Sequence, residues 1–215
     1  MIVSLNEIES VAFKACRGAG MMWGLAEEAA QAARWLAGSG LPWDRSLASL
    51  LALRNAVSSP LLSGQEIRAS APRTVLCPIH AGAAVSDLLG LHGRLTLYDV
   101  LEPLWLLPFA ARHARRNDDV VIRWIGGTIR FGLGSPMDAM DLANLGEGPI
   151  PNVTIELRRG GAVVADAALK QLLGGGSVVD EVAWTRLLQL VSLTYVPVSE
   201  HSRASGAGAG LLDND

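Results

Sequence analysis

The sequence of 215 residues lacks the residue patterns on which several classes of protein depend. Its two cysteines, Cys16 and Cys77, are too few for a disulfide framework or a four-cysteine zinc site, and they favour free thiols in a reducing cytoplasm. Its only lysines are Lys14 and Lys170, which leaves a Schiff-base mechanism just two candidates. Because the formal net charge is −3 and no basic face stands out, the sequence indicates no nucleic-acid partner.

Long apolar segments are also absent. The most apolar run, residues 100–111, is broken by Glu102, Pro103 and Pro108 and is shorter than the roughly 20 residues that span a bilayer. The N-terminus lacks the basic start and long apolar region of a signal peptide. Since half of the residues are hydrophobic, there is ample material for a core. We therefore expect a soluble, cytoplasmic protein with no membrane partner, folded as a single globular domain over residues 1–215.

The patterns along the chain predict an α+β fold with a helical N-terminal third, a mixed or antiparallel sheet in the middle and a long C-terminal helix. Ser4 and Glu7 have the spacing of a capping box that opens the first helix. The C-terminal helix is expected from Ser177 to Tyr195, with apolar residues at helical spacing. Further helices are expected over residues 22–37, 43–55 and 101–114, and strands over 74–77, 94–98, 120–125, 128–133, 152–157 and 162–169.

The last 22 residues, 194–215, gather the densest set of groups able to donate, accept or transfer protons. In the functional interpretation, Arg203 grips a carboxylate with its planar guanidinium, while Glu200 or His201 moves a proton. Alternating glycines would let backbone N–H groups approach the same ligand. The residues expected to bind the substrate here are Ser199, Arg203, Gly206 and Gly208. The alternative is a flexible tail, which alternating glycine and alanine also favour.

A second glycine-bearing turn, residues 17–20, separates the first two expected helices. Helix N-termini bind anions readily, so Arg17 and Gly18 could complete the carboxylate site from the other end of the chain. The alternative is a tight connection between two helices, in which glycine is needed for steric reasons alone.

Cys77 and His80 flank Pro78 just after an expected strand. A thiol and an imidazole at that place suit a nucleophile and its base, or half of a metal site. The default interpretation is ordinary packing for the thiol and a hydrogen-bonded loop histidine. The sequence assigns no metal site and identifies no cofactor.

Three passages resemble an uncharacterised bacterial family built on a domain of unknown function: SLNEIESVAFKACRGAGMMWGLAEEAA, LCPIHAGAAVSDLL and TYVPVSEHSRASGAGAGLLDND. The resemblance runs along the whole chain, but it implies no activity, cofactor or catalytic residue.

Two functions are therefore expected to compete. The first is an enzyme, or an enzyme-like protein, that acts on a small carboxylate or an amino-acid-like metabolite. The second is a non-catalytic accessory subunit or interaction module, which would bind a partner subunit or a second copy of the chain. Six tryptophans against three phenylalanines suit an interface as well as a core.

Overall fold

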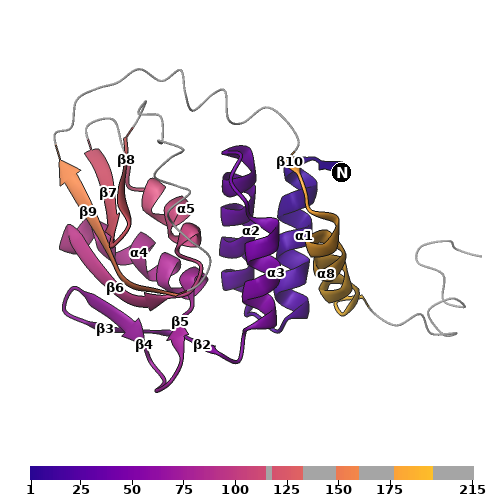
Figure 1. Cartoon of the computed structure of the whole chain (residues 1–215), viewed down its shortest axis with the longest axis horizontal. Coiled ribbons are helices and arrows are strands. Elements are labelled where there is room, and N and C mark those ends of the chain that lie inside the picture. Colours follow the sequence, from indigo (N-terminus) through magenta and orange to yellow (C-terminus); the bar gives the residue numbers. More distant parts are fainter. Residues whose placement is uncertain (115–117, 133–148, 160–176, 196–215) are drawn as a thin grey trace, which may run out of the picture.

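The computed structural model describes residues 1–114, 118–132, 149–159 and 177–195, and all statements below concern these ranges. A helical part and a sheet part lie side by side (Figure 1). The helical part contains α1 (Leu5–Gly18), α2 (Trp23–Gly38), α3 (Asp44–Ala52) and α8 (Glu181–Ser192). The sheet part contains a mixed sheet, α4 (Pro78–His92), the 3-10 helix η1 (Pro103–Trp105) and α5 (Leu106–Ala111). The described chain is thus α+β, with helices in its N-terminal third and a mixed sheet in its middle, as the sequence predicts.

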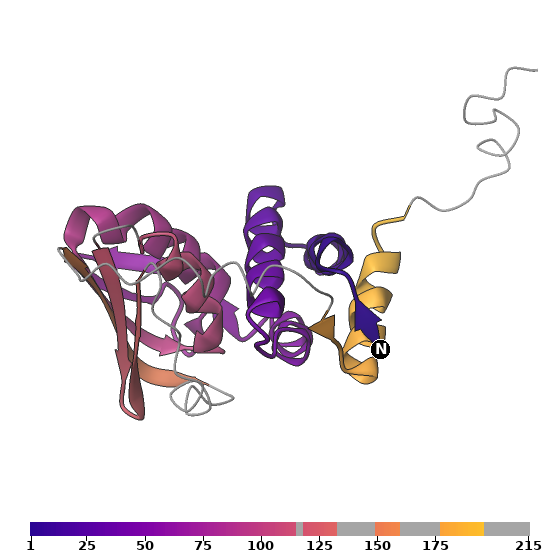
Figure 2. The same cartoon turned by 90° about the horizontal axis from the view of Figure 1, so that it is seen from above.

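Helix α1 begins where the sequence predicts. The backbone N–H of Glu7 donates to the Ser4 hydroxyl at 3.2 Å, which satisfies one of the free donors at the helix start. Apolar residues on one face of α1 are buried, and the alanine stripe of α2 packs close to it. Helix α8 covers another side of α1, so that α1 lies between α2 and α8 (Figure 2).

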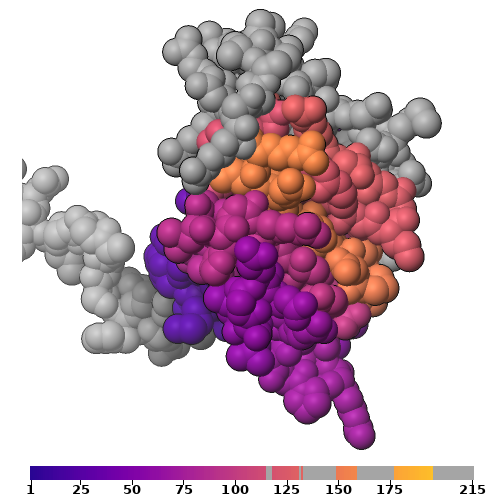
Figure 3. Space-filling view, turned by 90° about the vertical axis from the view of Figure 1, so that its left-hand side faces the viewer, coloured from indigo at the N-terminus to yellow at the C-terminus, as the bar shows by residue number. Residues whose placement is uncertain are grey.

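The sheet has the order β2-β5-β6-β9-β7-β8, with the β3–β4 hairpin joined to β6 through β4. Its strands are β2 (Val57–Ser58), β3 (Pro60–Ser63), β4 (Glu66–Ala69), β5 (Val75–Leu76), β6 (Arg94–Val100), β7 (Asp118–Trp124), β8 (Gly127–Phe131) and β9 (Ile150–Arg159). β6 runs parallel to β4 and β5 and antiparallel to β9, which makes the sheet mixed. On the outer face of the sheet part, orange residues of β9 lie beside pink residues of β7 and β8 (Figure 3).

Helices α4 and α5 lie between the sheet and the helical part (Figure 2). Trp105 Nε1 donates to the hydroxyl of Ser46 on α3 at 2.9 Å, and Arg112 forms an ion pair with Glu28 of α2 at 2.6 Å. Buried residues form one continuous hydrophobic cluster that runs through both parts. The two parts are therefore packed together by a shared core and tied by polar contacts across their boundary.

The long C-terminal helix expected over residues 177–195 is not supported at that length. Ser177 and Val178 instead form the short strand β10, which pairs antiparallel with β1 (Ile2–Val3). Asp180 then caps α8, because its side chain accepts from the backbone N–H of Ala183. α8 therefore has 12 residues and ends at Ser192, and residues 196–215 lie outside the described part.

Three other expectations have different outcomes. The helix predicted over residues 101–114 is divided into η1 and the short α5, because Pro103 and Pro108 each remove a backbone N–H. The β-hairpin predicted over residues 120–133 is confirmed, with β7 and β8 in register from Val120 opposite Phe131 to Trp124 opposite Gly127. The strand expected over residues 162–169 lies outside the described residues.

Candidate functional site

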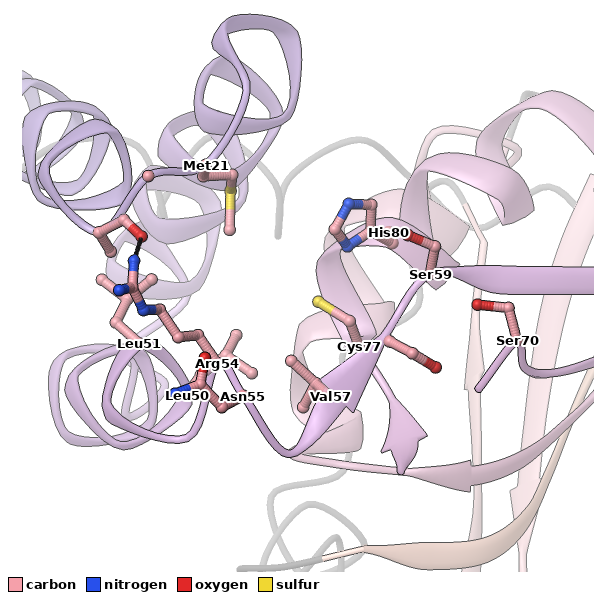
Figure 4. Close-up of a pocket in the computed structure, with 13 residues that line it drawn as sticks. Met21, Leu50, Leu51, Arg54, Asn55, Val57, Ser59, Ser70, Cys77 and His80 are labelled. Atoms are coloured by element: carbon pink, nitrogen blue, oxygen red, sulfur yellow. Dashed lines mark hydrogen bonds between the residues drawn. The ribbon is translucent and has the colours of Figure 1, made fainter. Parts of the chain in front are cut away.

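A cavity of about 440 Å³ lies at the boundary between the helical part and the sheet part (Figure 4). Its walls come from the α1–α2 turn, the end of α3, the segment around β2, the segment after β4, and the start of α4. Met21, Leu50, Leu51 and Val57 supply apolar surface. The volume falls within the range of roughly 300–1,000 Å³ that is typical of small-molecule sites.

The polar side chains of the cavity form two groups that face each other. Arg54 and Asn55 approach from the end of α3, in the helical part (Figure 4). Ser59, Ser70, Cys77 and His80 approach from the sheet part (Figure 4), and Ser58 also lines the cavity. Among the described residues, no aspartate or glutamate lines the cavity, so this part of the lining carries positive but no negative charge.

Arg54 supplies that positive charge. Its Nη1 donates to the backbone carbonyl of Ala19, which fixes the guanidinium against the α1–α2 turn. A guanidinium carries five N–H donors, so most of them stay available for a ligand. Among the described residues, no carboxylate forms an ion pair with Arg54. The α1–α2 turn approaches closely at this point because Gly20 has a φ of +86°, a conformation that glycine adopts most readily.

The serine hydroxyls are placed by a short ladder of backbone hydrogen bonds. The N–H of Cys77 donates to the carbonyl of Ser58 at 3.1 Å, and the N–H of Ser70 donates to the carbonyl of Ser59 at 3.0 Å. The hydroxyl of Ser58 lies 2.8 Å from that of Thr74. These bonds fix the backbone of the three serines in the wall on the sheet side, and the Ser58 hydroxyl accepts from Thr74 there.

Cys77 and His80 lie at the N-terminal end of α4. Pro78 is the first residue of the helix, where its fixed φ is favourable and its missing N–H is not needed. The strand expected over residues 74–77 does end before Pro78, as β5 (Val75–Leu76), whereas the interpretation of His80 as a loop histidine is wrong. Cys77 is the N-cap residue of α4, and His80 lies within its first turn.

The electrostatics of this wall keep both groups uncharged near neutral pH. Cys77 is 2 % exposed, and burial raises the pKa of its thiol. The backbone N–H groups of His80 and Ile79 face the sulfur and oppose that rise, although neither forms a hydrogen bond of normal geometry with it. Burial lowers the pKa of His80, which favours the neutral imidazole.

The imidazole of His80 has one ring nitrogen that the fold does not use. Its Nδ1 is buried and has no hydrogen-bond partner among the described residues. Leaving a buried polar atom without a partner costs on the order of 1–3 kcal/mol, so such an atom is a natural contact for a ligand. Within the described ranges, no group of three or more His, Cys, Asp and Glu side chains could hold a metal ion.

The predicted site residues are only partly described. Glu200, His201, Ser199, Arg203, Gly206 and Gly208 all lie in residues 196–215, outside the described part, so their roles stay predictions. Arg17 does not line the cavity; its Nη1 donates to the carbonyl of Met21, and its guanidinium lies 5.6 Å from the centre of the Trp23 ring. Gly18 allows α8 to approach α1, because a Cβ there would lie 1.9 Å from the Leu190 carbonyl oxygen.

Sequence reasoning missed Arg54 and the three serines. They occupy stretches interpreted as a helix end and a loop, and no local spacing marks them as a site. The one available signal was the pair Cys77 and His80, for which a catalytic or metal role was weighed without being preferred.

The N-terminal part of the chain has recognisable relatives. Residues 3–78 match a family described as a protein of unknown function (DUF3726). This confirms, over these residues, the resemblance to a family built on a domain of unknown function; the resemblance of the rest of the chain and the bacterial origin stay predictions. A search of curated proteins finds no match. None of the helices in the described ranges has the length and apolar character needed to span a lipid bilayer.

Proposed function

We propose that this protein binds a small carboxylate-bearing metabolite in the cavity between its helical and sheet parts. One observation carries the proposal: the cavity joins a guanidinium that no described carboxylate neutralises to serine hydroxyls and an unpartnered imidazole nitrogen. Arginine suits a carboxylate because its planar fork can bond both oxygens. The hydroxyls and the imidazole can bond the remainder of a polar ligand. We place the protein in the cytoplasm, because both cysteines are free thiols.

The proposal keeps the ligand class expected from the sequence and moves its anchor. The sequence favours Arg203, whereas the described cavity offers Arg54. The two are compatible if residues 196–215 add groups to the same ligand, and the roles of Arg203, Glu200 and His201 remain part of the proposal. Metal-free acid–base or nucleophilic chemistry on the bound carboxylate is the enzymatic form of this function.

Titration calorimetry on the full chain tests the proposal with a panel of mono- and dicarboxylates of two to six carbons. We expect at least one compound to bind. The Arg54→Met variant should weaken it by about ten- to a hundredfold, because a hydrogen bond to a charged group contributes roughly 1.5–3 kcal/mol. Arg54→Lys should weaken it less, since the charge is kept while the two-pronged geometry is lost.

The matched control is Arg186→Met, which makes the same chemical change at an exposed residue of α8 that does not line the cavity. Affinity in this control should equal that of the unmodified protein. Equal affinity in the Arg54→Met variant would refute Arg54 as the anchor, and a panel without any binder would refute the carboxylate site.

A second candidate function is the interaction module. The observation that favours it is an exposed apolar surface beside α1, where Trp23 is 60 % exposed and packs edge-on against Phe13 with ring centroids 5.0 Å apart. Tyr195, also exposed, follows the end of α8, and Nζ of Lys14 on α1 lies 6.0 Å from its ring centre. Exposed aromatic side chains are enriched in the interfaces of protein complexes.

A further inference from the structure

The first turn of α4 brings a thiol and an imidazole to one wall of the cavity. Cys77 is the N-cap residue of α4, and His80 follows three residues later. These are the two positions of a capping box, in which the side chains at the N-cap and at the third helical residue turn toward the same end of the helix. Both side chains point into the cavity in Figure 4.

Cys77 packs in the hydrophobic core and borders the cavity, whereas packing does not account for one nitrogen of His80. The Nδ1 of His80 is buried without a partner among the described residues, and Cys77 is a free cysteine in a cavity wall. The chain has one comparison for Cys77: Cys16 is a fully buried residue of α1 that does not line the cavity, and its thiol has a pKa raised to about 12. Both thiols are buried, with Cys77 2 % and Cys16 0 % exposed, and of the two it is Cys77 that borders the cavity.

The opposite wall determines which ligands would meet this pair. Arg54 lies in the helical part, across the cavity from Cys77 and His80, with its guanidinium turned toward the α1–α2 turn (Figure 4). We infer that Cys77 is a nucleophile toward small carboxylates that carry an electrophilic carbon, and that His80 accepts its proton. This inference rests on the proposed function, because Arg54 must hold the carboxylate.

The covalent step needs no co-reactant. A sulfur lone pair of Cys77 forms an S–C bond with the electrophilic carbon. That carbon releases one electron pair, either to a departing group or onto its own carbonyl oxygen. The thiol proton passes to Nδ1 of His80, which is free to accept it, and from there to the departing group or to the oxygen. A neutral imidazole is required for this transfer, and burial favours that form.

Alkylation of the folded full-length protein tests the inference. Iodoacetate is a small carboxylate with an electrophilic carbon, and iodoacetamide is its uncharged counterpart. Peptide mass spectrometry would follow each cysteine with both reagents, in the folded protein and in urea. We expect the ratio of the iodoacetate rate to the iodoacetamide rate at Cys77 to be at least tenfold higher in the folded protein than in urea. Cys16 should stay unmodified while the protein is folded, and excess acetate should slow the reaction of Cys77 with iodoacetate.

Two variants separate the roles of the partners. Arg54→Met should return the rate ratio at Cys77 to its value in urea. His80→Gln should slow both reagents by about tenfold or more without changing the ratio. It should also remove the inflection that imidazole titration gives the Cys77 rate between pH 5 and pH 8.

The result in the unmodified protein decides the matter even if a variant fails to fold. Equal rate ratios in the folded protein and in urea, or reaction of Cys77 only after unfolding, would overturn the inference. Because calorimetry detects carboxylate binding separately, binding without enhanced alkylation would refute the nucleophile and leave the proposed function intact.

Discussion

Substitution of Gly18 by alanine tests the closest helix contact in the described fold. Gly18 is the last residue of α1, and a Cβ built there would lie 1.9 Å from the Leu190 carbonyl oxygen and 2.7 Å from its carbonyl carbon. Both neighbours are backbone atoms of α8, so no side-chain rotation relieves the overlap. Restoring an ordinary contact of 3.4 Å requires α8 to withdraw by about 1.5 Å. Such a movement weakens the packing of α8, because a gap of about 0.5–1 Å already removes roughly a quarter to a half of the dispersion energy of a contact.

The expected cost follows from what α8 buries. Its buried residues are Ala183, Trp184, Leu187 and Val191, which would all lose contact as the helix withdraws. Overpacking of this kind costs about 1–3 kcal/mol. Alanine is favoured over glycine inside helices by roughly 0.5–1 kcal/mol, and this gain is smaller at a helix end. The overlap therefore dominates, and we expect Gly18→Ala to lower the free energy of unfolding.

Thermal unfolding measures the effect. A loss of about 1–3 kcal/mol corresponds to a melting temperature lower by roughly 2–12 °C in a chain of this size. The control is Gly24→Ala in α2, where a Cβ meets nothing within 4 Å, so the melting temperature should stay the same or rise. A Gly18→Ala protein as stable as the Gly24→Ala protein would show that α8 is not seated on α1 as described.

Two further predictions concern His80 and Trp23. The pKa of His80 is lowered in the folded state, so the unfolded chain binds the proton more readily. The free energy of unfolding should therefore fall as the pH drops below about 6.5. Urea unfolding at pH 7 and pH 5 should show a smaller fall in the His80→Gln variant. An equal fall in both proteins would contradict it. If the Trp23 surface joins two copies, the unmodified protein should sediment as a dimer at tens of micromolar and Trp23→Ala as a monomer, whereas identical monomeric sedimentation would exclude self-association.

The sequence predicts the elements whose signals are local. The spacing of Ser4 and Glu7 predicts the start of α1, and the two β-branched runs around Gly126 and Gly127 predict the β7–β8 hairpin. Both depend on residues within a few positions of one another, for which capping and turn chemistry are sufficient. The start of the last helix is less predictable from local signals. Ser177, expected in that helix, instead belongs to β10, which pairs with β1 at the other terminus.

The cavity could not be predicted from the sequence, because it also depends on contacts between distant segments of the chain. Met21, Arg54, Ser70 and Cys77 meet only because the helical part packs against the sheet part, and no local pattern encodes that meeting. The expected loop at His80 concealed the relation between Cys77 and His80. A proline after a β-branched run ends a strand and also begins a helix well, and only the second assignment places Cys77 and His80 at capping positions on one wall.

The extent of the family match bears on where function is located. Residues 3–78 include every residue that lines the cavity except His80, which follows two residues after the match ends. The matched segment therefore carries the carboxylate anchor, the serine wall and the thiol of the proposed site.

That segment cannot bury its own surfaces, however. β5 pairs with β6, which lies beyond the match, and α1 packs on α8 near the other end of the described chain. Cys77 is the last lining residue within the match, while His80 belongs to α4, which packs most extensively on α5 and β6, both beyond the match. A function held by residues 3–78 thus requires the rest of the fold to position it, and the binding and alkylation experiments are informative only on the full-length protein.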